Sequence, residues 1–151
     1  MIFFLDTSAL LKLYLEEDGS AELERACAAP GLKLAQSAMG GLEFRAVLRA
    51  MERNREVTAL QVDRIVTDLA RRGILQQPFG SSVIETAERM LDRHPLRAPD
   101  AVQLASCMAV NATQRQTSVW FVCSDRVLLQ AAVAEGLRHW DPASGAASPG
   151  W

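Results

Sequence analysis

The sequence has few cysteines, few histidines and no long apolar run, and each shortage excludes a class of protein. The three cysteines, Cys27, Cys107 and Cys123, are an odd number without a CxxC spacing. We therefore expect the reduced thiols of a cytosolic protein, with neither disulfides nor a zinc site. The histidines, His94 and His139, stand far apart and away from any cysteine, which disfavours a zinc ligand set. No apolar run approaches the roughly 20 residues of a membrane span, and no basic leader precedes the apolar N-terminus, so we expect neither a membrane segment nor a signal peptide.

The composition is that of an ordinary globular domain. The 151 residues are 49% hydrophobic and 23% charged. A chain of this length buries about 70% of its unfolded surface, so its core needs no disulfides. We expect one domain over residues 1–141 and a short mobile tail over residues 142–151, which consist largely of small residues, proline and glycine.

Positive charge is unevenly distributed along the chain. The net charge is −2, from 16 basic and 18 acidic residues, which excludes a protein that coats nucleic acid by charge alone. Residues 45–72 nevertheless hold seven arginines and four acids. Arginine suits bidentate phosphate contacts, so Arg45, Arg49 and Arg53 on one predicted helix are candidate contacts to a nucleic-acid backbone. A solvated helix face is the simpler interpretation of the same charges.

Short apolar runs alternate with helical segments along the chain. We expect strands at residues 1–5, 32–36, 74–77, 119–123 and 137–140. The intervening segments predict helices at 7–15, 19–29, 38–53, 58–72, 81–93, 99–110 and 124–135, and residues 111–117 form a polar loop. Thr7 or Ser8 would cap the first helix, and Ser124 the last. This order predicts an α/β sandwich with a mostly parallel sheet, in which ligands bind beyond the carboxyl ends of the strands.

Two carboxylates follow predicted strands closely. Asp6 comes directly after the first strand, and Asp125 follows the strand at 119–123, behind Ser124. If both strands are central and parallel, the two carboxylates project at the same edge of the sheet. Taken singly, each is better explained as an acid stabilising a helix N-terminus. Their joint placement favours a functional site.

Glu43 interrupts an apolar stripe of the helix predicted at 38–53. At 100° per residue, Val47 and Ala50 fall beside Glu43, with Leu42 and Ala46 on the other side of the stripe. A carboxylate in that position must be paired, protonated or bound to metal, because an unpaired buried charge is unfavourable. A buried ion pair with one of the neighbouring arginines is the structural alternative.

Asp100 repeats this pattern at the start of the helix that follows Pro99. It shares a face with Leu104 and Cys107, which indicates that it points inward. Its structural alternative is again an acid that caps its own helix.

None of these four acids has an obvious cation nearby in the sequence. If they converge, their charges repel unless a cation intervenes. Mg²⁺ or Mn²⁺ suits carboxylate and water ligands, and such a site can activate water for attack on a phosphodiester. Ser8 and Ser124 could add a hydroxyl ligand, although plain helix caps explain them equally well.

Four segments resemble, in family order, the motifs of PIN-domain nucleases. Residues 4–10 (FLDTSAL) resemble the opening motif, and residues 37–43 (SAMGGLE) the segment with the second acid. Residues 96–105 (LRAPDAVQLA) closely resemble the third block, and residues 123–132 (CSDRVLLQAA) the fourth. The third block is fairly specific, and the ordered set over residues 2–132 makes the resemblance strong. The single-domain size resembles the VapC-type toxins of bacterial and archaeal toxin–antitoxin pairs.

The resemblance implies a three-layer α/β/α sandwich with about five parallel strands. It further implies a cytoplasmic RNA endonuclease dependent on Mg²⁺ or Mn²⁺, a homodimer, and inhibition by a small antitoxin protein. The acids at the metal would be Asp6, Glu43, Asp100 and Asp125. A non-catalytic interaction module with the same fold is the main alternative. A phosphatase of the haloacid-dehalogenase type is disfavoured, because Ser8 stands at its usual second aspartate and no convincing catalytic lysine follows.

Overall fold

A five-stranded parallel sheet forms the centre of the molecule. The computed structural model describes residues 1–150. The sheet has the order β3-β2-β1-β4-β5, and all four strand pairs are parallel. The predicted fold class, an α/β sandwich with about five mostly parallel strands, is confirmed. The strands are β1 (Ile2–Leu5), β2 (Lys33–Ser37), β3 (Leu75–Gln77), β4 (Val119–Val122) and β5 (His139–Trp140).

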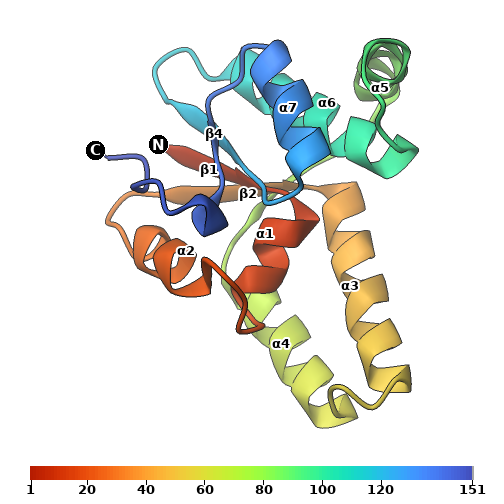
Figure 1. Ribbon diagram of the computed structural model, residues 1–151, viewed down its shortest axis with the longest axis vertical. Coiled ribbons are helices and arrows are strands. Elements are labelled where there is room, and N and C mark those ends of the chain that lie inside the picture. The colour runs from red at the N-terminus through yellow and green to blue at the C-terminus, as the bar shows by residue number, and fades with distance from the viewer. Residues whose placement is uncertain (151) are drawn as a thin grey trace.

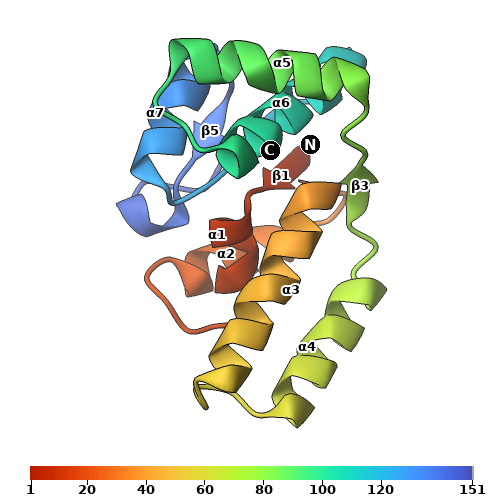
Figure 2. The ribbon, with the colours of Figure 1, turned by 90° about the vertical axis from the view of Figure 1, so that its right-hand side faces the viewer.

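Helices cover both faces of this sheet (Figures 1 and 2). The helices that pack into the core on one face are α1 (Thr7–Lys12), α2 (Ser20–Cys27), α3 (Ala38–Arg53) and α4 (Ala59–Arg71). Those that pack into the core on the other face are α5 (Ser81–Arg93), α6 (Ala98–Thr113) and α7 (Arg126–Ala134). Within residues 1–150, no helix is long and apolar enough to cross a membrane.

The central strand β1 is buried on both faces because helices cover both. Side chains alternate along a strand, so Phe4 joins the core formed with α5, α6 and α7, whereas Phe3 and Leu5 join the core formed with α1 to α4. Each fully buried side chain of this size contributes about 1.5–3 kcal/mol. The two cores therefore hold β1, and with it the backbone of Asp6, firmly in the middle of the molecule.

The chain changes the side on which it adds strands between β1 and β4, while all strands stay parallel. From β1 the chain builds outward through β2 to β3, then crosses back to β4 on the other side of β1 and ends at β5. In open parallel sheets this switch point leaves a crevice at the carboxyl ends of the two strands. The segments after β1 and β4 contain Asp6 and Asp125, so the predicted common edge of these two carboxylates is confirmed.

Helix ends differ from the sequence predictions at several places. Helix α1 ends at Lys12 and not at Leu15, and α6 continues to Thr113, into the predicted polar loop. The caps predicted at Thr7 or Ser8 and at Ser124 are wrong by one or two residues, whereas the alternative explanation of Asp6 and Asp125 as capping acids is confirmed. Asp6 and Asp125 cap α1 and α7, because each carboxylate accepts a hydrogen bond from a backbone N–H of the first turn.

The segment after β5 packs against α2. Pro142–Ser144 forms a 3₁₀ turn in which Pro142 is buried. Gly19, the N-cap of α2, has φ +86°, and a Cβ there would lie 2.5 Å from the carbonyl carbon of Pro142, so this approach requires glycine. The mobility expected for residues 142–151 stays a prediction, and Trp151 lies outside the described residues.

Candidate functional site

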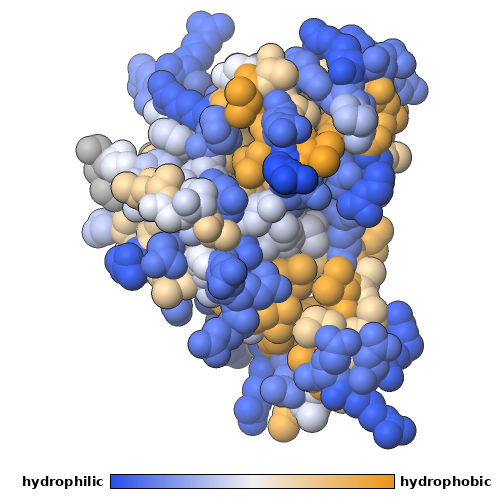
Figure 3. Space-filling model, in the orientation of Figure 1, coloured by the Kyte–Doolittle hydropathy of each residue, from blue (hydrophilic) through white to orange (hydrophobic). Residues whose placement is uncertain are grey.

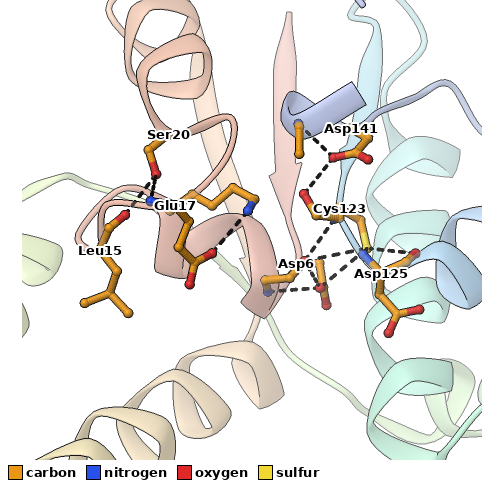
Figure 4. A network of polar contacts seen from close by, with 11 residues as sticks. Asp6, Leu15, Glu17, Ser20, Cys123, Asp125 and Asp141 are labelled. Carbon is orange, nitrogen blue, oxygen red and sulfur yellow. Dashed lines mark hydrogen bonds and ion pairs between the residues drawn. The ribbon is translucent and has the colours of Figure 1, made fainter. Parts of the chain in front are cut away.

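Asp6 lies at the carboxyl end of the central strand, with 5% of its surface exposed. Its Oδ2 accepts hydrogen bonds from the backbone N–H of Ser8 (3.0 Å), the hydroxyl of Ser8 (2.8 Å) and the thiol of Cys123 (3.5 Å) (Figure 4). Burial raises the pKa of Asp6 above its ordinary value, and the Ser8 hydrogen bonds oppose this only in part. A nearby cation would therefore favour its ionised form.

Ser8 and Ser124 connect the segments that follow the neighbouring strands β1, β4 and β5. The Ser8 hydroxyl oxygen, which donates to Asp6, accepts a hydrogen bond from the backbone N–H of Ser124 at 3.0 Å. The Ser124 hydroxyl donates to Oδ1 of Asp141 at 2.7 Å, just after β5. Both hydroxyls thus hold the edge of the sheet together. Their predicted part as metal ligands stays a prediction.

The buried face of α3 differs from the predicted stripe. Gly40, Phe44 and Leu48 are buried, whereas Leu42 is 65% exposed. The prediction was wrong because apolar residues occur all round this helix, and packing against the sheet and α4 selects one of several possible faces. Glu43 lies half-buried at the border of that face.

Two uncharged donors hold Glu43. Its Oε2 accepts hydrogen bonds from the hydroxyl of Thr7 (2.9 Å) and the side-chain amide of Gln103 (2.8 Å). The same Gln103 nitrogen also donates to the Thr7 oxygen (2.9 Å). No ion pair of Glu43 with an arginine occurs in residues 1–150, and Arg49 instead pairs with Glu52 and Asp63. Glu43 thereby connects α3 both to the residue after Asp6 and to α6.

Gln103 is a site residue that the sequence predictions missed. It is 1% exposed, and its Oε1 has no hydrogen-bond partner among the described residues. Gly40 makes room for it, since a Cβ at Gly40 would lie 2.8 Å from the Gln103 amide nitrogen. The available signal was one amide side chain between Val102 and Leu104 in an apolar helix.

Asp100 pairs with a cation on its own chain segment. Nε and Nη2 of Arg97 donate to Oδ2 and Oδ1 of Asp100 at 3.0 and 3.2 Å, and the Arg97 backbone N–H donates to Oδ2 at 3.3 Å. The expectation that no acid has a nearby cation is therefore wrong for Asp100. The hydrogen bond and charge of Asp100 raise the pKa of Arg97, and the charges of Asp125 and Glu43 add to this effect. Three of the predicted acids thus act on one guanidinium.

Cys123 connects Asp6 with Asp125. The backbone N–H of Asp125 donates to Sγ of Cys123 at 3.2 Å, and the Cys123 thiol donates to Asp6 (Figure 4). Burial and the neighbouring Asp6 charge raise the pKa of this thiol well above its usual range, so it stays neutral. The Asp125 carboxylate caps α7 through the backbone N–H of Leu128 at 2.9 Å. Asp125 therefore both caps α7 and lies at the edge of the sheet.

The structure places the four predicted acids around the ends of β1 and β4, but not as a closed ligand cage. Within residues 1–150, no three histidine, cysteine or acidic side chains form a group that could hold a metal ion. The donors still fit a hard divalent cation, because all are carboxylates and Asp6 is buried. The Arg97 guanidinium on Asp100 already shows a cation held at this edge.

Solved structures show the same fold. VapBC2 from Rickettsia felis, solved with a promoter DNA fragment, has a TM-score of 0.67 at 12% identity, covering 93% of this chain and 98% of the other. VapBC-1 from nontypeable Haemophilus influenzae has a TM-score of 0.63 at 16% identity, covering 95% and 100%. VapC20 from Mycobacterium tuberculosis, a sarcin-ricin loop cleaving toxin, has a TM-score of 0.61 at 18% identity, covering 85% and 94%.

The comparison with family models identifies the family. A comparison with curated protein sequences gives no match. The model of the PIN domain matches residues 3–134, a span that contains Asp6, Glu43, Asp100 and Asp125. This match sets aside the phosphatase alternative. The chain belongs to the PIN domain family.

Proposed function

We propose that this protein is an endoribonuclease dependent on Mg²⁺ or Mn²⁺ and the toxin of a toxin–antitoxin pair. One observation carries the proposal: the chain has the PIN fold, and Asp6 and Asp125 follow the two strands at the switch point of its parallel sheet. The fold shared with VapBC complexes and with VapC20 supports it. A toxin that cleaves RNA would act in the cytoplasm.

Asp6 and Asp100 would hold the cation, with Glu43 as a ligand directly or through water. An ion held there would supply a water of lowered pKa and a positive charge that offsets the negative charge developing on phosphate. Asp125 completes the site or orients the attacking water. Thr7 and Gln103 keep Glu43 in place, and Ser8 and Cys123 do the same for Asp6. Such supporting hydrogen bonds matter, because catalytic groups must be held in a productive geometry.

Arginines along α3 would supply contacts to the RNA backbone. Arg45 and Arg53 are exposed on α3, whereas Arg49 lies between Glu52 and Asp63. Phosphate contacts supply affinity and orientation but carry no sequence information. Selectivity would then depend on RNA shape and on bases exposed in loops.

Apolar surface on both sides of the site suits protein partners. Figure 3 shows hydrophobic side chains gathered over the α5–α7 region and over α3 and α4, and the ends of β1 and β4 lie between them in the same view (Figure 1). Exposed apolar patches often mark protein interfaces. We propose that such surface binds a small antitoxin and a second copy of the chain. Large exposed hydrophobic side chains on these helices are Leu42 on α3, Leu60 on α4, Ile84 and Leu91 on α5, and Val127 and Val133 on α7.

Incubation with end-labelled structured RNA in Mg²⁺ or Mn²⁺ tests the proposal. We expect discrete cuts that require the metal and disappear in Asp6→Asn and Asp100→Asn, while both variants stay folded. Asp92→Asn, at an exposed acid on α5, is the matched control and should cut normally. Full activity of Asp6→Asn or Asp100→Asn would contradict the assigned roles. If the protein neither cuts RNA nor binds Mn²⁺ in calorimetry, the non-catalytic interaction module becomes the better explanation.

A further inference from the structure

Arg97 is bound to Asp100, one of the carboxylates proposed to hold the divalent cation. The guanidinium and the cation therefore compete for the same carboxylate. We propose that Arg97 is the resident counter-cation of the site. It pairs with Asp100 until a divalent cation takes that carboxylate, and it then binds a phosphate of the RNA. This inference rests on the proposed function and adds a residue that links metal binding to RNA binding.

The pairing between Arg97 and Asp100 uses both carboxylate oxygens. The guanidinium donates one hydrogen bond to each oxygen, and the backbone N–H of Arg97 donates a further one to Oδ2. A bidentate pair of this kind uses one lone pair on each carboxylate oxygen, on the side where a chelating metal ion would also bind. A divalent ion at Asp100 therefore has to displace the guanidinium or accept its repulsion at close range.

The Arg97 side chain can leave Asp100 without disturbing the fold. It precedes α6 and is 78% exposed, whereas the Asp100 side chain is 17% exposed. Among the described residues, the Arg97 guanidinium has no hydrogen-bond or ion-pair partner other than Asp100. The carboxylate thus stays where its helix holds it, and the guanidinium is the partner that moves.

Arg97 differs from the other basic side chains in the acid with which it pairs. Within residues 1–150, no other ion pair joins a basic side chain to any of the four acids. Arg93, four residues earlier, pairs instead with Glu135 at the end of α7. The charges of Asp125 and Glu43 also act on Arg97, so its guanidinium lies near three of the four acids.

Release of Arg97 would turn a repulsive edge into one that accepts phosphate. Without metal, surplus carboxylates repel the RNA backbone, and Arg97 is neutralised by Asp100. With a divalent ion on the acids, the freed guanidinium presents a planar pair of donors that matches phosphate oxygens. Metal and RNA then favour each other's binding, and this coupling is reciprocal.

The first test measures Mn²⁺ alone, by calorimetry on the full chain at low salt. We expect Arg97→Gln to bind Mn²⁺ about two- to ten-fold more tightly than the wild type, because a competing exposed cation is gone. Arg97→Lys, which keeps the charge but not the bidentate fork, should fall between them. Arg93→Gln is the matched control and should bind Mn²⁺ like the wild type. In an Asp100→Asn background, Arg97→Gln should no longer tighten binding.

Equal or weaker Mn²⁺ binding by Arg97→Gln would overturn the role of Arg97 and leave the proposed nuclease function intact. Absence of Mn²⁺ binding by the wild type would overturn both. The two failures are therefore distinguishable without any cleavage assay.

The second test measures RNA binding with saturating Mn²⁺, by fluorescence anisotropy of a phosphorothioate-linked RNA hairpin. We expect Arg97→Gln to bind the hairpin at least about two-fold more weakly, and the slope of log affinity against log salt to fall by about one. Without metal, the wild type and Arg97→Gln should bind the hairpin alike, because Asp100 already neutralises Arg97. An unchanged salt slope with Mn²⁺ present would overturn the transfer of Arg97 to phosphate.

Discussion

The four acids at the sheet edge form two pairs that the fold holds in different ways. Asp6 and Glu43 accept hydrogen bonds from distant parts of the chain, Glu43 from Thr7 and Gln103 and Asp6 from Cys123, although Asp6 also caps its own helix through Ser8. Asp100 and Asp125 are held by the N-terminal turns of their own helices, through backbone N–H groups and, for Asp100, through Arg97. Both pairs lie around the ends of β1 and β4.

This difference separates a rigid half of the site from an adjustable one. The donors to Asp6 and Glu43 are partly or fully buried and belong to packed elements, so these carboxylates have little freedom. The partners of Asp100 and Asp125 are local, and Arg97 is exposed to solvent. A metal ion would thus meet carboxylates already oriented by their donors and, at Asp100, one whose exposed partner can move.

Gln103→Leu should produce the largest effect, because it removes the buried amide that holds Glu43 in the rigid half. We expect kcat for RNA cleavage to fall about 10- to 100-fold, as for other groups that orient a metal ligand. The loss of two hydrogen bonds should also lower the free energy of unfolding by about 1–3 kcal/mol. Cleavage kinetics and urea unfolding measure the two effects.

Ser106→Ala is the matched control for this change. Ser106 lies on the same helix and donates a buried hydrogen bond to the Ser37 hydroxyl, at 3.1 Å, without touching an acid. It should lose stability but keep kcat. Equal kcat losses in the two variants would show that α6 packing, and not the amide on Glu43, is what catalysis needs.

Two adjacent glycines of α3 test the same half with a smaller change. Gly40→Ala puts a Cβ 2.8 Å from the Gln103 nitrogen, so the amide must shift away from Glu43, and we expect a several-fold loss of kcat. Gly41→Ala meets the Gln36 amide nitrogen at 3.4 Å and the Gln76 amide oxygen at 3.7 Å, both ordinary contacts. It should keep full activity and gain up to about 1 kcal/mol from helix propensity. A Gly40→Ala enzyme as active as Gly41→Ala would contradict the rigid placement of Gln103.

Asp125 allows capping and chemistry to be separated in the adjustable half. Asp125→Asn keeps a side-chain acceptor for the Leu128 N–H, whereas Asp125→Ala loses it and should be about 1 kcal/mol less stable. Both variants lose the negative charge, so we expect similar decreases in RNA cleavage. Thermal unfolding and cleavage rates of the two variants check this. Normal cleavage by Asp125→Asn would make Asp125 a structural cap alone.

The pH dependence of stability should report the burial of Asp6 and is the smallest expected effect. The pKa of Asp6 in the folded protein is raised above the ordinary 3.8, so the folded state holds this proton more tightly than the unfolded chain. Its favourable contribution is complete below the unfolded pKa and is lost as the pH rises through the folded pKa. Without metal, wild-type stability should therefore decline relative to Asp6→Asn across that range.

Urea unfolding of both proteins in a metal chelator, from acid to neutral pH, measures the difference. Addition of Mn²⁺ should restore the relative stability of the wild type, because the ion binds the folded state and favours the ionised carboxylate. Parallel stability curves for the two proteins without metal would indicate that Asp6 is not buried as described.

Several site features were predictable because they depend on short-range pattern. Asp6 and Asp125 follow apolar runs that form β1 and β4, so their common edge follows from strand order. Arg97 and Asp100 stand three residues apart at a helix start, a spacing at which side chains meet, and this signal was available but not used. The face that buries part of Glu43 was not predictable, because apolar residues surround α3 on several sides.

The sequence alone determined the alternation of strands and helices and the parallel sheet. It also showed the four acids in the order typical of the family. These features depend on hydrophobic periodicity and on positions relative to strand and helix ends, which act over a few residues. Only the three-dimensional packing decides which groups hold the acids. Thr7 and Gln103 lie 36 and 60 residues from Glu43, and Cys123 lies 117 from Asp6. Contacts at such separations leave no periodic trace in the sequence, because they form only when the two helical layers close on the sheet.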